Sequence, residues 1–369
     1  MLLLATKVWE QRELNKTNDV RDGTHDTPKY IDSGYPLITS KNLTSSGTIN
    51  FDDISYISED DFNFINKRSN VDTNDILFGM IGTIGNPVLV GNDTNFAIKN
   101  VALIKKSDSI NQYFLINILN SNIFKKYIIK TNQGNTQKFI SLSQIRKFTF
   151  YAPQLYEQIE IGKILQKIDS VITLYERKIK ALKKLKQAIF EVLNSIPHKS
   201  NVYRISEIFD VTRGNVLSKK SISNKFSNMY PVYSSQTKND GLLGYYSDYL
   251  FENSITWTTD GANAGTVKYR TGKFYCTNVC GVLLNSEGYC NEYTAEVIEK
   301  ETPKFVSHVG NPKLMNNVMK QIKIKLPDVA TQQSYSDILL TFDNVCTSFC
   351  NKLNDLNQIK NKLLNTMFI

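Results

Sequence analysis

The chain has 369 residues, which is enough for two or three domains of ordinary size. Hydrophobic residues make up 41% of it and charged residues 21%, a balance that supports packed cores and excludes a largely disordered chain. The net charge of +9 favours a polyanionic partner but does not identify it.

The cysteines and the amino-terminal run bear on the cellular compartment. Five cysteines, an odd number, do not indicate a disulfide framework in a chain of this length. The opening "MLLLATKVWEQ" has too short an apolar run for a signal peptide or a membrane span, so we expect a cytoplasmic protein. The pairs Cys276/Cys280 and Cys346/Cys350 are interpreted as small buried side chains, with a zinc site as the alternative.

Residues 1–152 form the first predicted domain, and residues 153–196 the first predicted long helix. In the domain, short apolar segments are separated by Gly, Asn, Asp and Pro, which is typical of short strands joined by turns. The helix begins just after Pro153 and has apolar residues at helical spacing. Its stretch Arg177–Lys186 has six basic residues and no acidic one. Taken alone, this stretch could be a membrane-surface or calmodulin-type helix.

Residues 197–326 form a second predicted domain that echoes the first. The segments Phe78–Ile104 and Trp257–Leu284 are similar. The residues that they share are Gly82/Gly261, Gly85/Gly265, Phe96/Phe274, Asn100/Asn278 and Val101/Val279.

Residues 327–369 form the second predicted long helix, which matches the first without gaps at an offset of 174 residues (327 minus 153). The apolar pattern is kept and the charge pattern is not, so we expect the two apolar stripes to pack against each other as an antiparallel coiled coil. The predicted helix seam consists of Ile164, Leu165, Ile168, Ile179, Leu182, Leu185 and Ile189 in the first helix, and Ile338, Leu339, Phe342, Phe349, Leu353, Leu356 and Leu363 in the second.

The predicted fold class is therefore α+β. Two pseudo-twofold-related domains, made mostly of short strands with some helix, are separated by two long antiparallel coiled-coil helices. A single chain of this kind imitates a symmetric dimer, and it suits a target that has two half-sites, as duplex DNA does.

Several long motifs resemble one known family. "WEQREL" and "DGTHDTPKYIDSGYPLITSKNL" resemble the opening of one class of its target-recognition domains, and "ITWTTDGANAGTVKYRTGKFYCTNVCGVL" resembles a second class. "EQIEIGKILQKIDSVITLYERKIKALKKLKQ" resembles the family's central repeat. The motifs span nearly the whole chain, which is similar to the specificity subunit of type I restriction–modification enzymes.

The resemblance implies a non-catalytic subunit of a methyltransferase and endonuclease complex. Each of two target-recognition domains would read one half of a split DNA target, and the helix pair would set the gap and dock two methyltransferase subunits. The full complex would add two motor-nuclease subunits and would not involve a membrane. The resemblance implies no cofactor in this chain, because S-adenosylmethionine, ATP and Mg would belong to the partner subunits.

Polar loops in both domains have donors and acceptors suited to base edges or phosphates, and the resemblance places the loops that precede each helix near DNA. The alternative is turn chemistry with solvated side chains. No catalytic residue and no metal ligand is expected. The candidate DNA-binding residues are Thr24, His25, Lys29, Lys41, Asn42, Gln133, Asn135, Gln137, Lys138, Arg213, Ser235, Gln236, Lys238, Asn263, His308, Asn311 and Lys313.

Two other protein classes are weighed against this one. A single-chain DNA methyltransferase would need a cofactor motif and an Asn/Asp-Pro-Pro-aromatic tetrapeptide, and the sequence has neither. Its histidines have no metal or triad spacing, and there is no Walker A motif. A stand-alone coiled-coil adaptor for protein partners explains the helices but not two polar, Gly-punctuated domains. Salt-dependent binding to duplex DNA separates the adaptor from the DNA-reading subunit.

Overall fold

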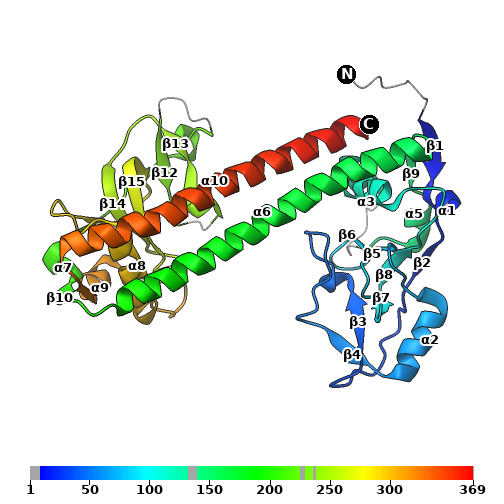
Figure 1. Cartoon of the computed structure of the whole chain (residues 1–369), viewed down its shortest axis with the longest axis horizontal. Coiled ribbons are helices and arrows are strands. Elements are labelled where there is room, and N and C mark those ends of the chain that lie inside the picture. The colour runs from blue at the N-terminus through cyan, green and yellow to red at the C-terminus, as the bar shows by residue number, and fades with distance from the viewer. Residues whose placement is uncertain (1–8, 132–138, 225–228, 236–237, 369) are drawn as a thin grey trace. The chain divides into compact units, whose positions relative to one another are not determined.

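The computed structural model describes residues 9–131, 139–224, 229–235 and 238–368 (Figure 1). The chain divides into two compact units, Met1–Glu176 with Asn351–Ile369, and Arg177–Cys350. Each unit holds one β-rich domain and one part of each of two long helices, α6 (Leu155–Ser195) and α10 (Val329–Met367). The α+β class, with two β-rich domains and two long helices, is confirmed, and α6 follows the first domain as α10 follows the second.

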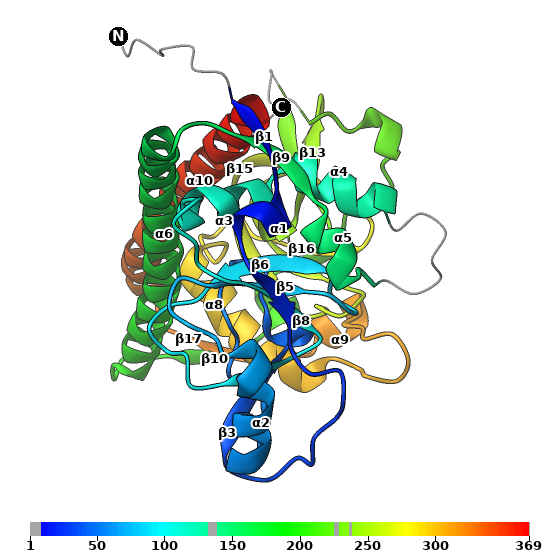
Figure 2. The same cartoon turned by 90° about the vertical axis from the view of Figure 1, so that its right-hand side faces the viewer.

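In the described part of the first domain, the strands form three small sheets (Figure 2). β1 (Glu10–Glu13) pairs antiparallel with β9 (Thr149–Ala152). The other sheets have the strand orders β2-β8-β5-β6 and β4-β3-β7. Their strands are β2 (Val20–Asp22), β3 (Tyr35–Thr39), β4 (Ser55–Ile57), β5 (Ile76–Gly79), β6 (Gly85–Leu89), β7 (Ala97–Lys99) and β8 (Val101–Ile104). The helices are α1 (Leu14–Thr17), the 3₁₀ turn η1 (Ser40–Asn42), α2 (Glu59–Ser69), α3 (Gln112–Asn120), α4 (Asn122–Thr131) and α5 (Leu142–Arg146).

The second domain again pairs its first and last strands, β10 (Asn201–Arg204) and β17 (Lys323–Leu326), antiparallel. Its main sheet has the order β11-β16-β14-β15-β12-β13. The strands are β11 (Asp210–Arg213), β12 (Tyr230–Tyr233), β13 (Leu242–Tyr246), β14 (Phe251–Thr258), β15 (Val267–Cys276) and β16 (Cys280–Leu284). The helical segments are α7 (Ile205–Ile208), η2 (Lys219–Ser221), η3 (Lys238–Gly241), α8 (Glu292–Glu301), η4 (Thr302–Phe305) and α9 (Asn316–Met319).

The two long helices begin in the same way. α6 has 41 residues and α10 has 39, so each is about 60 Å long. Near the start of α6, Gln158 Nε2 donates to the carbonyl of Pro153 at 2.8 Å, and near the start of α10, Gln332 Nε2 donates to the carbonyl of Pro327 at 2.8 Å. Gln158 and Gln332 are related by the 174-residue offset of the repeat, so they have one structural role in both copies.

A row of buried and half-buried residues runs along each long helix at alternating spacings of three and four, as in a coiled coil. The two rows are related by the offset of 174 residues. They consist of Leu165, Ile168, Ile172, Tyr175, Ile179, Leu182, Lys186, Ile189 and Leu193 in α6, and of Leu339, Phe342, Cys346, Phe349, Leu353, Leu356, Lys360, Leu363 and Met367 in α10.

Three residues of the predicted seam lie outside these rows. Ile164 is 57% exposed, Leu185 49% and Ile338 42%. Each immediately precedes a row residue, and one residue turns a helix by about 100°, which rotates the side chain away from the seam. The other predicted seam residues are buried or half-buried.

Each domain shares its hydrophobic core with the long helices of its own unit. In the first unit, Phe114 of α3 belongs to the same buried cluster as Leu165 of α6 and Leu364 of α10. In the second unit, the fully buried Trp257 belongs to a cluster that contains Phe190 of α6 and Leu339 of α10. Burying each such side chain contributes about 1.5–3 kcal/mol, so each domain is fastened to its helix segments.

Candidate nucleic-acid interface

In each domain, a strand ends at a tight turn that contains a glycine, and the first candidate DNA-binding residues lie at this turn. In the first domain, Gly23 follows β2, and its amide donates to the carbonyl of Val101 at 3.0 Å. The next amide, of Thr24, donates to the carbonyl of Ile98 at 3.1 Å. A Cβ on Gly23 would lie 2.1 Å from that Ile98 oxygen, so any other residue would push the two strands apart.

The second domain repeats this turn. The Gly214 amide, after β11, donates to the carbonyl of Cys280 at 3.0 Å, and the Asn215 amide donates to the carbonyl of Cys276 at 3.1 Å. A Cβ on Gly214 would again lie 2.1 Å from the facing oxygen, here that of Cys276. The two domains therefore present Thr24 and Asn215 at equivalent points.

His25, the residue after Thr24, is held by a hydrogen bond at each ring nitrogen. Its Nδ1 lies 2.8 Å from Asn100 Oδ1 and its Nε2 lies 2.9 Å from Asp22 Oδ2. The bonds to Asn100 and then Asp22 raise the pKa of His25 above its ordinary value of 6.5, because both acceptors are satisfied only when both ring nitrogens carry protons. The side chain is 53% exposed, so this charge can approach a phosphate.

The other candidate DNA-binding residues of the first domain differ in how far their side chains are exposed and free of hydrogen bonds within the domain. Lys29 is exposed, and Lys41 forms an exposed ion pair with Asp53 at 3.1 Å. Asn42 is 2% exposed: its Oδ1 accepts from the amide and hydroxyl of Thr39, and its Nδ2 donates to the carbonyls of Asn50 and Asp53. The amide of Asn42 therefore closes a turn, and its hydrogen bonds are made within the domain. Four candidates lie outside the described residues: Gln133, Asn135, Gln137 and Lys138.

A second pair of equivalent loops follows the central strands. In the first domain, the amide of Ile140 donates to the carbonyl of Met80 at 3.0 Å, and in the second the amide of Leu314 donates to the carbonyl of Thr259 at 2.9 Å. In both, the loop after the strand turns at glycines with positive φ: Gly82 and Gly85, and Gly261 and Gly265.

In the second domain, this pairing brings together candidates that are far apart in sequence. The amide of Gly261 donates to the carbonyl of Pro312 at 3.0 Å, so the loop of Asn263 lies beside the loop that carries His308, Asn311 and Lys313. All four candidate side chains are exposed. Lys313 also lies 4.0 Å from Asp260, across a bridge between the two loops.

The remaining candidates of the second domain are placed as follows. Arg213, at the end of β11, donates to Asn316 Oδ1 at 3.0 Å and is half-buried. Ser235 is half-buried, and Lys238 begins η3. Gln236 lies outside the described residues.

Sequence reasoning missed the residues that orient these side chains. Asn100 holds His25 from a backbone with φ of 54°, and Asn316 holds Arg213. Asn100 was signalled by its place among the repeat pairs, whereas Asn316 had no comparable signal.

The described residues contain no group of three or more His, Cys, Asp and Glu side chains that could hold a metal ion. Burial raises the pKa of the Cys276 thiol far above its ordinary value and that of Cys280 to about 11, which keeps both thiols protonated. Among the same residues, no helix has both the length and the hydropathy needed to cross a membrane.

Comparisons with known proteins agree on one family. A family model described as the type I restriction modification DNA specificity domain matches residues 9–184 and again residues 197–361. A protein named as the N-terminus of a type I specificity subunit of Mycoplasma pneumoniae is 40% identical over 143 residues, which are 38% of this chain and 76% of that protein. The specificity subunit of the type I restriction enzyme MpnII of that organism is 37% identical over 147 residues, 39% of this chain and 44% of that protein.

The fold has a counterpart among solved structures. The crystal structure of the S subunit of a type I restriction–modification system from M. genitalium matches with a TM-score of 0.72 and 17% identity, over 100% of this chain and 98% of that one. The likeness extends over both β-rich domains and both long helices.

Proposed function

The chain belongs to the type I restriction modification DNA specificity family, and on that basis we propose that each of its two β-rich domains reads one half of a split DNA target. As the specificity subunit of a type I enzyme, it is itself non-catalytic. In this proposal it selects the DNA on which partner subunits act.

The observation that carries the proposal is the duplicated loop geometry. The turns at Gly23 and Gly214 have equivalent hydrogen bonds, and so do the loops closed by the amides of Ile140 and Leu314. Two domains that hold different polar side chains on the same backbone frame are suited to read two different short sequences with one docking geometry.

The charges of the exposed candidates fit this role. Lys29 and Lys313 are basic side chains that would position the domains on phosphates, and the raised pKa of His25 favours its charged ring for the same contact. Asn263 and Asn311 carry both a donor and an acceptor, and a side-chain amide can pair with adenine in the major groove.

We propose that the helix pair sets the gap between the two half-sites. In each unit an ion pair joins the long helices, Lys186 with Asp343 in one and Lys360 with Asp169 in the other. The repeat relates Lys186 to Lys360 and Asp169 to Asp343, so each pair joins the lysine of one copy to the aspartate of the other. Such cross-pairing fixes an antiparallel register, because a shift by one heptad would separate both pairs.

An exposed apolar stripe on the long helices supports docking of two methyltransferase subunits. It consists of residues that immediately precede the seam rows, with exposures of 38–62%. In the first unit these are Ile164, Val171, Leu174 and Ile359, and in the second they are Leu185, Val192, Ile338 and Val345. Each unit therefore offers an equivalent patch, as two copies of one partner require. Two motor-nuclease subunits would complete the complex, and the partners would bind S-adenosylmethionine, ATP and Mg.

The test is to replace one domain and map the methylated target. In the assembled complex, exchange of residues 9–150 for the corresponding domain of another family member should change one half of the target and leave the other half and the gap unchanged. A change in both halves would contradict independent reading by the two domains. Salt-independent DNA binding by the wild-type chain would favour a protein adaptor instead.

A further inference from the structure

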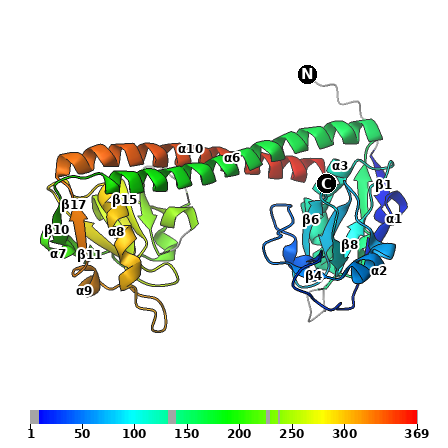
Figure 3. The ribbon, with the colours of Figure 1, turned by 60° about the horizontal axis from the view of Figure 1, so that its bottom comes forward.

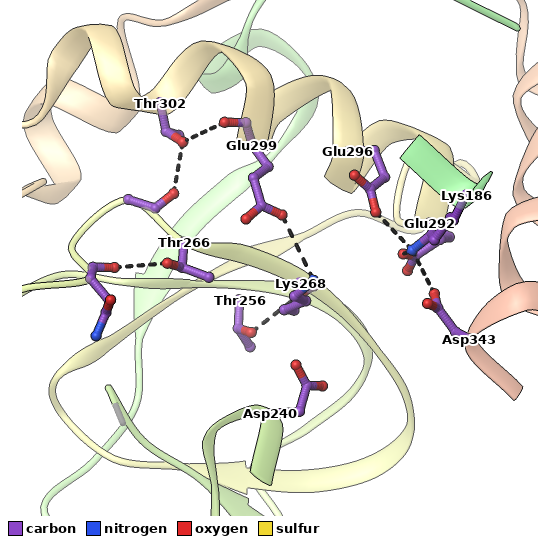
Figure 4. A network of polar contacts seen from close by, with 12 residues as sticks. Lys186, Asp240, Thr256, Thr266, Lys268, Glu292, Glu296, Glu299, Thr302 and Asp343 are labelled. Atoms are coloured by element: carbon purple, nitrogen blue, oxygen red, sulfur yellow. Dashed lines mark hydrogen bonds and ion pairs between the residues drawn. The ribbon is translucent and has the colours of Figure 1, made fainter. Parts of the chain in front are cut away.

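Lys186 belongs to the basic stretch Arg177–Lys186 but does not lie on a solvated face. It occupies a seam position of α6, and its side chain is 11% exposed. Its Nζ lies 2.6 Å from Glu292 and 2.7 Å from Glu296, both of α8, and 2.7 Å from Asp343 of α10 (Figure 4). Burial alone would lower the pKa of Lys186, but these carboxylates raise it above its ordinary value, so the ammonium stays charged.

α8 leads from Lys186 to the candidate DNA-facing loops of the second domain, and it lies against the sheet of that domain (Figure 3). Just after α8, the hydroxyl of Thr302 donates to the carbonyl of Gly265 at 2.7 Å, in the loop that carries Asn263. The chain then continues through η4 to the loop of His308. Glu299, on the same helix, lies 3.9 Å from Lys268 of β15.

The first turn of α8 is also held by neutral bonds. The amide of Glu292 donates to Ser336 Oγ at 3.0 Å, and the side chain of Asn291 donates to Gln332 at 3.1 Å. These bonds fasten one end, about which a helix can tilt. The buried contact of Lys186 with Glu296, one turn further along, holds the helix axis more firmly than the exposed pair of Lys300 with Glu191 of α6 near the far end. Over a helix of about 15 Å, a tilt of about 10° would move the far end by roughly 3 Å.

In the first domain, the helix equivalent to α8 has no acidic residues at the two positions that contact Lys186 in the second domain. This helix, α3, also starts after an asparagine cap, Asn111, and has Gln112 and Ile116 where α8 has Glu292 and Glu296. Ile116 packs on the apolar core of its unit. The repeat-related Lys360 is paired with Asp169. The acidic contact to the helix pair is therefore a feature of the second domain.

We propose that Lys186 is a positioning residue for DNA recognition, which fixes the tilt of α8 and thereby the placement of the DNA-facing loops of the second domain. The inference rests on the proposed function, because it assigns Lys186 to the half-site that the second domain reads. Lys186 acts through α8 and does not itself touch the DNA in this proposal.

The experiment uses the assembled complex with its methyltransferase partners. The target is mapped first, and the half read by each domain is identified by the exchange of residues 9–150. Methylation rates are then measured on duplexes with one base pair changed in either half. The variants are Lys186→Met and the double variant Glu292→Gln/Glu296→Gln, which leaves Lys186 paired with Asp343 and avoids stranded buried carboxylates. Lys360→Met is the matched control.

We expect Lys186→Met and Glu292→Gln/Glu296→Gln to lower discrimination at the second half-site by roughly tenfold, the contribution of about one good base contact. Discrimination at the first half-site should stay within about twofold of the wild type. Lys360→Met removes only an ion pair between the long helices, so it should not lower discrimination at one half-site more than at the other. A purely structural role would lower methylation of all duplexes equally. Unchanged discrimination in the double variant, or equal losses at both halves, would overturn the inference. A wild-type target that is not split would refute the proposed function, whatever the variants do.

Discussion

The glycine turns offer the sharpest test of the duplicated recognition frame. In Gly23→Ala, the new Cβ would start 2.1 Å from the carbonyl oxygen of Ile98, and real Cβ atoms essentially never approach closer than 3.0 Å. The clash is with backbone, so no side-chain rotation relieves it. The strand ends must therefore separate by about 1 Å.

The cost follows from the hydrogen bonds at this turn. Separation weakens the bond from Gly23 to Val101 and the bond from Thr24 to Ile98. At about 1 kcal/mol each, the loss is about 2 kcal/mol, concentrated at the residues that carry Thr24 and His25. Since about 1.4 kcal/mol is a factor of ten, we expect discrimination at the first half-site to fall by tenfold or more. By the same reasoning, Gly214→Ala should act on the second half-site alone.

The assay is the methylation rate of the assembled complex on duplexes altered in one half-site. Gly91→Ala is the matched control in the first domain, because a Cβ there meets nothing within 4 Å. It should leave both half-sites unaffected. If Gly23→Ala discriminates as well as the wild type, or if it weakens both halves equally, the turn does not place a recognition loop and the reasoning fails.

Three further predictions concern the helices and His25. Insertion of one heptad into both α6 and α10 should lengthen the gap by about three base pairs, because seven residues rise about 10.5 Å; methylome sequencing that shows an unchanged gap would exclude a ruler. Ile164→Asp with Val171→Asp should weaken assembly with methyltransferase subunits in size-exclusion chromatography, whereas Phe64→Asp, at a 72% exposed residue off the stripe, should not. DNA affinity should fall as pH rises through the raised pKa of His25, above 6.5, since the folded protein favours the charged ring below that pKa; an equally steep profile in His25→Gln would contradict this.

Much of the architecture was accessible from the sequence because it is duplicated. The gap-free echo revealed two long helices, and each begins two residues after its proline, at Leu155 and Val329. The glycine pairs Gly82/Gly261 and Gly85/Gly265 marked turns that share positive φ. Repetition filters out accidental patterns, so positions kept in both copies were reliable guides.

The phase of the helix seam was harder to predict. Apolar residues occupy both the seam rows and the exposed stripe, so hydrophobicity alone could not separate Ile164 from Leu165. Lys186 and Lys360 occupy seam positions that are otherwise mostly apolar. The apolar pattern could not predict them, because the carboxylates that pair with them come from other segments. Asn42 shows a similar difficulty, because a polar residue in a loop hydrogen-bonds to the backbone as readily as to a ligand.

The central claim, two domains that independently read the two halves of one target, is tested most directly by mapping methylated DNA for the wild-type complex and for the complex with residues 9–150 exchanged. The account predicts a split target in the wild type and, in the exchanged complex, one new half with the other half and the gap retained. An unsplit wild-type target, or two altered halves after the exchange, would contradict it.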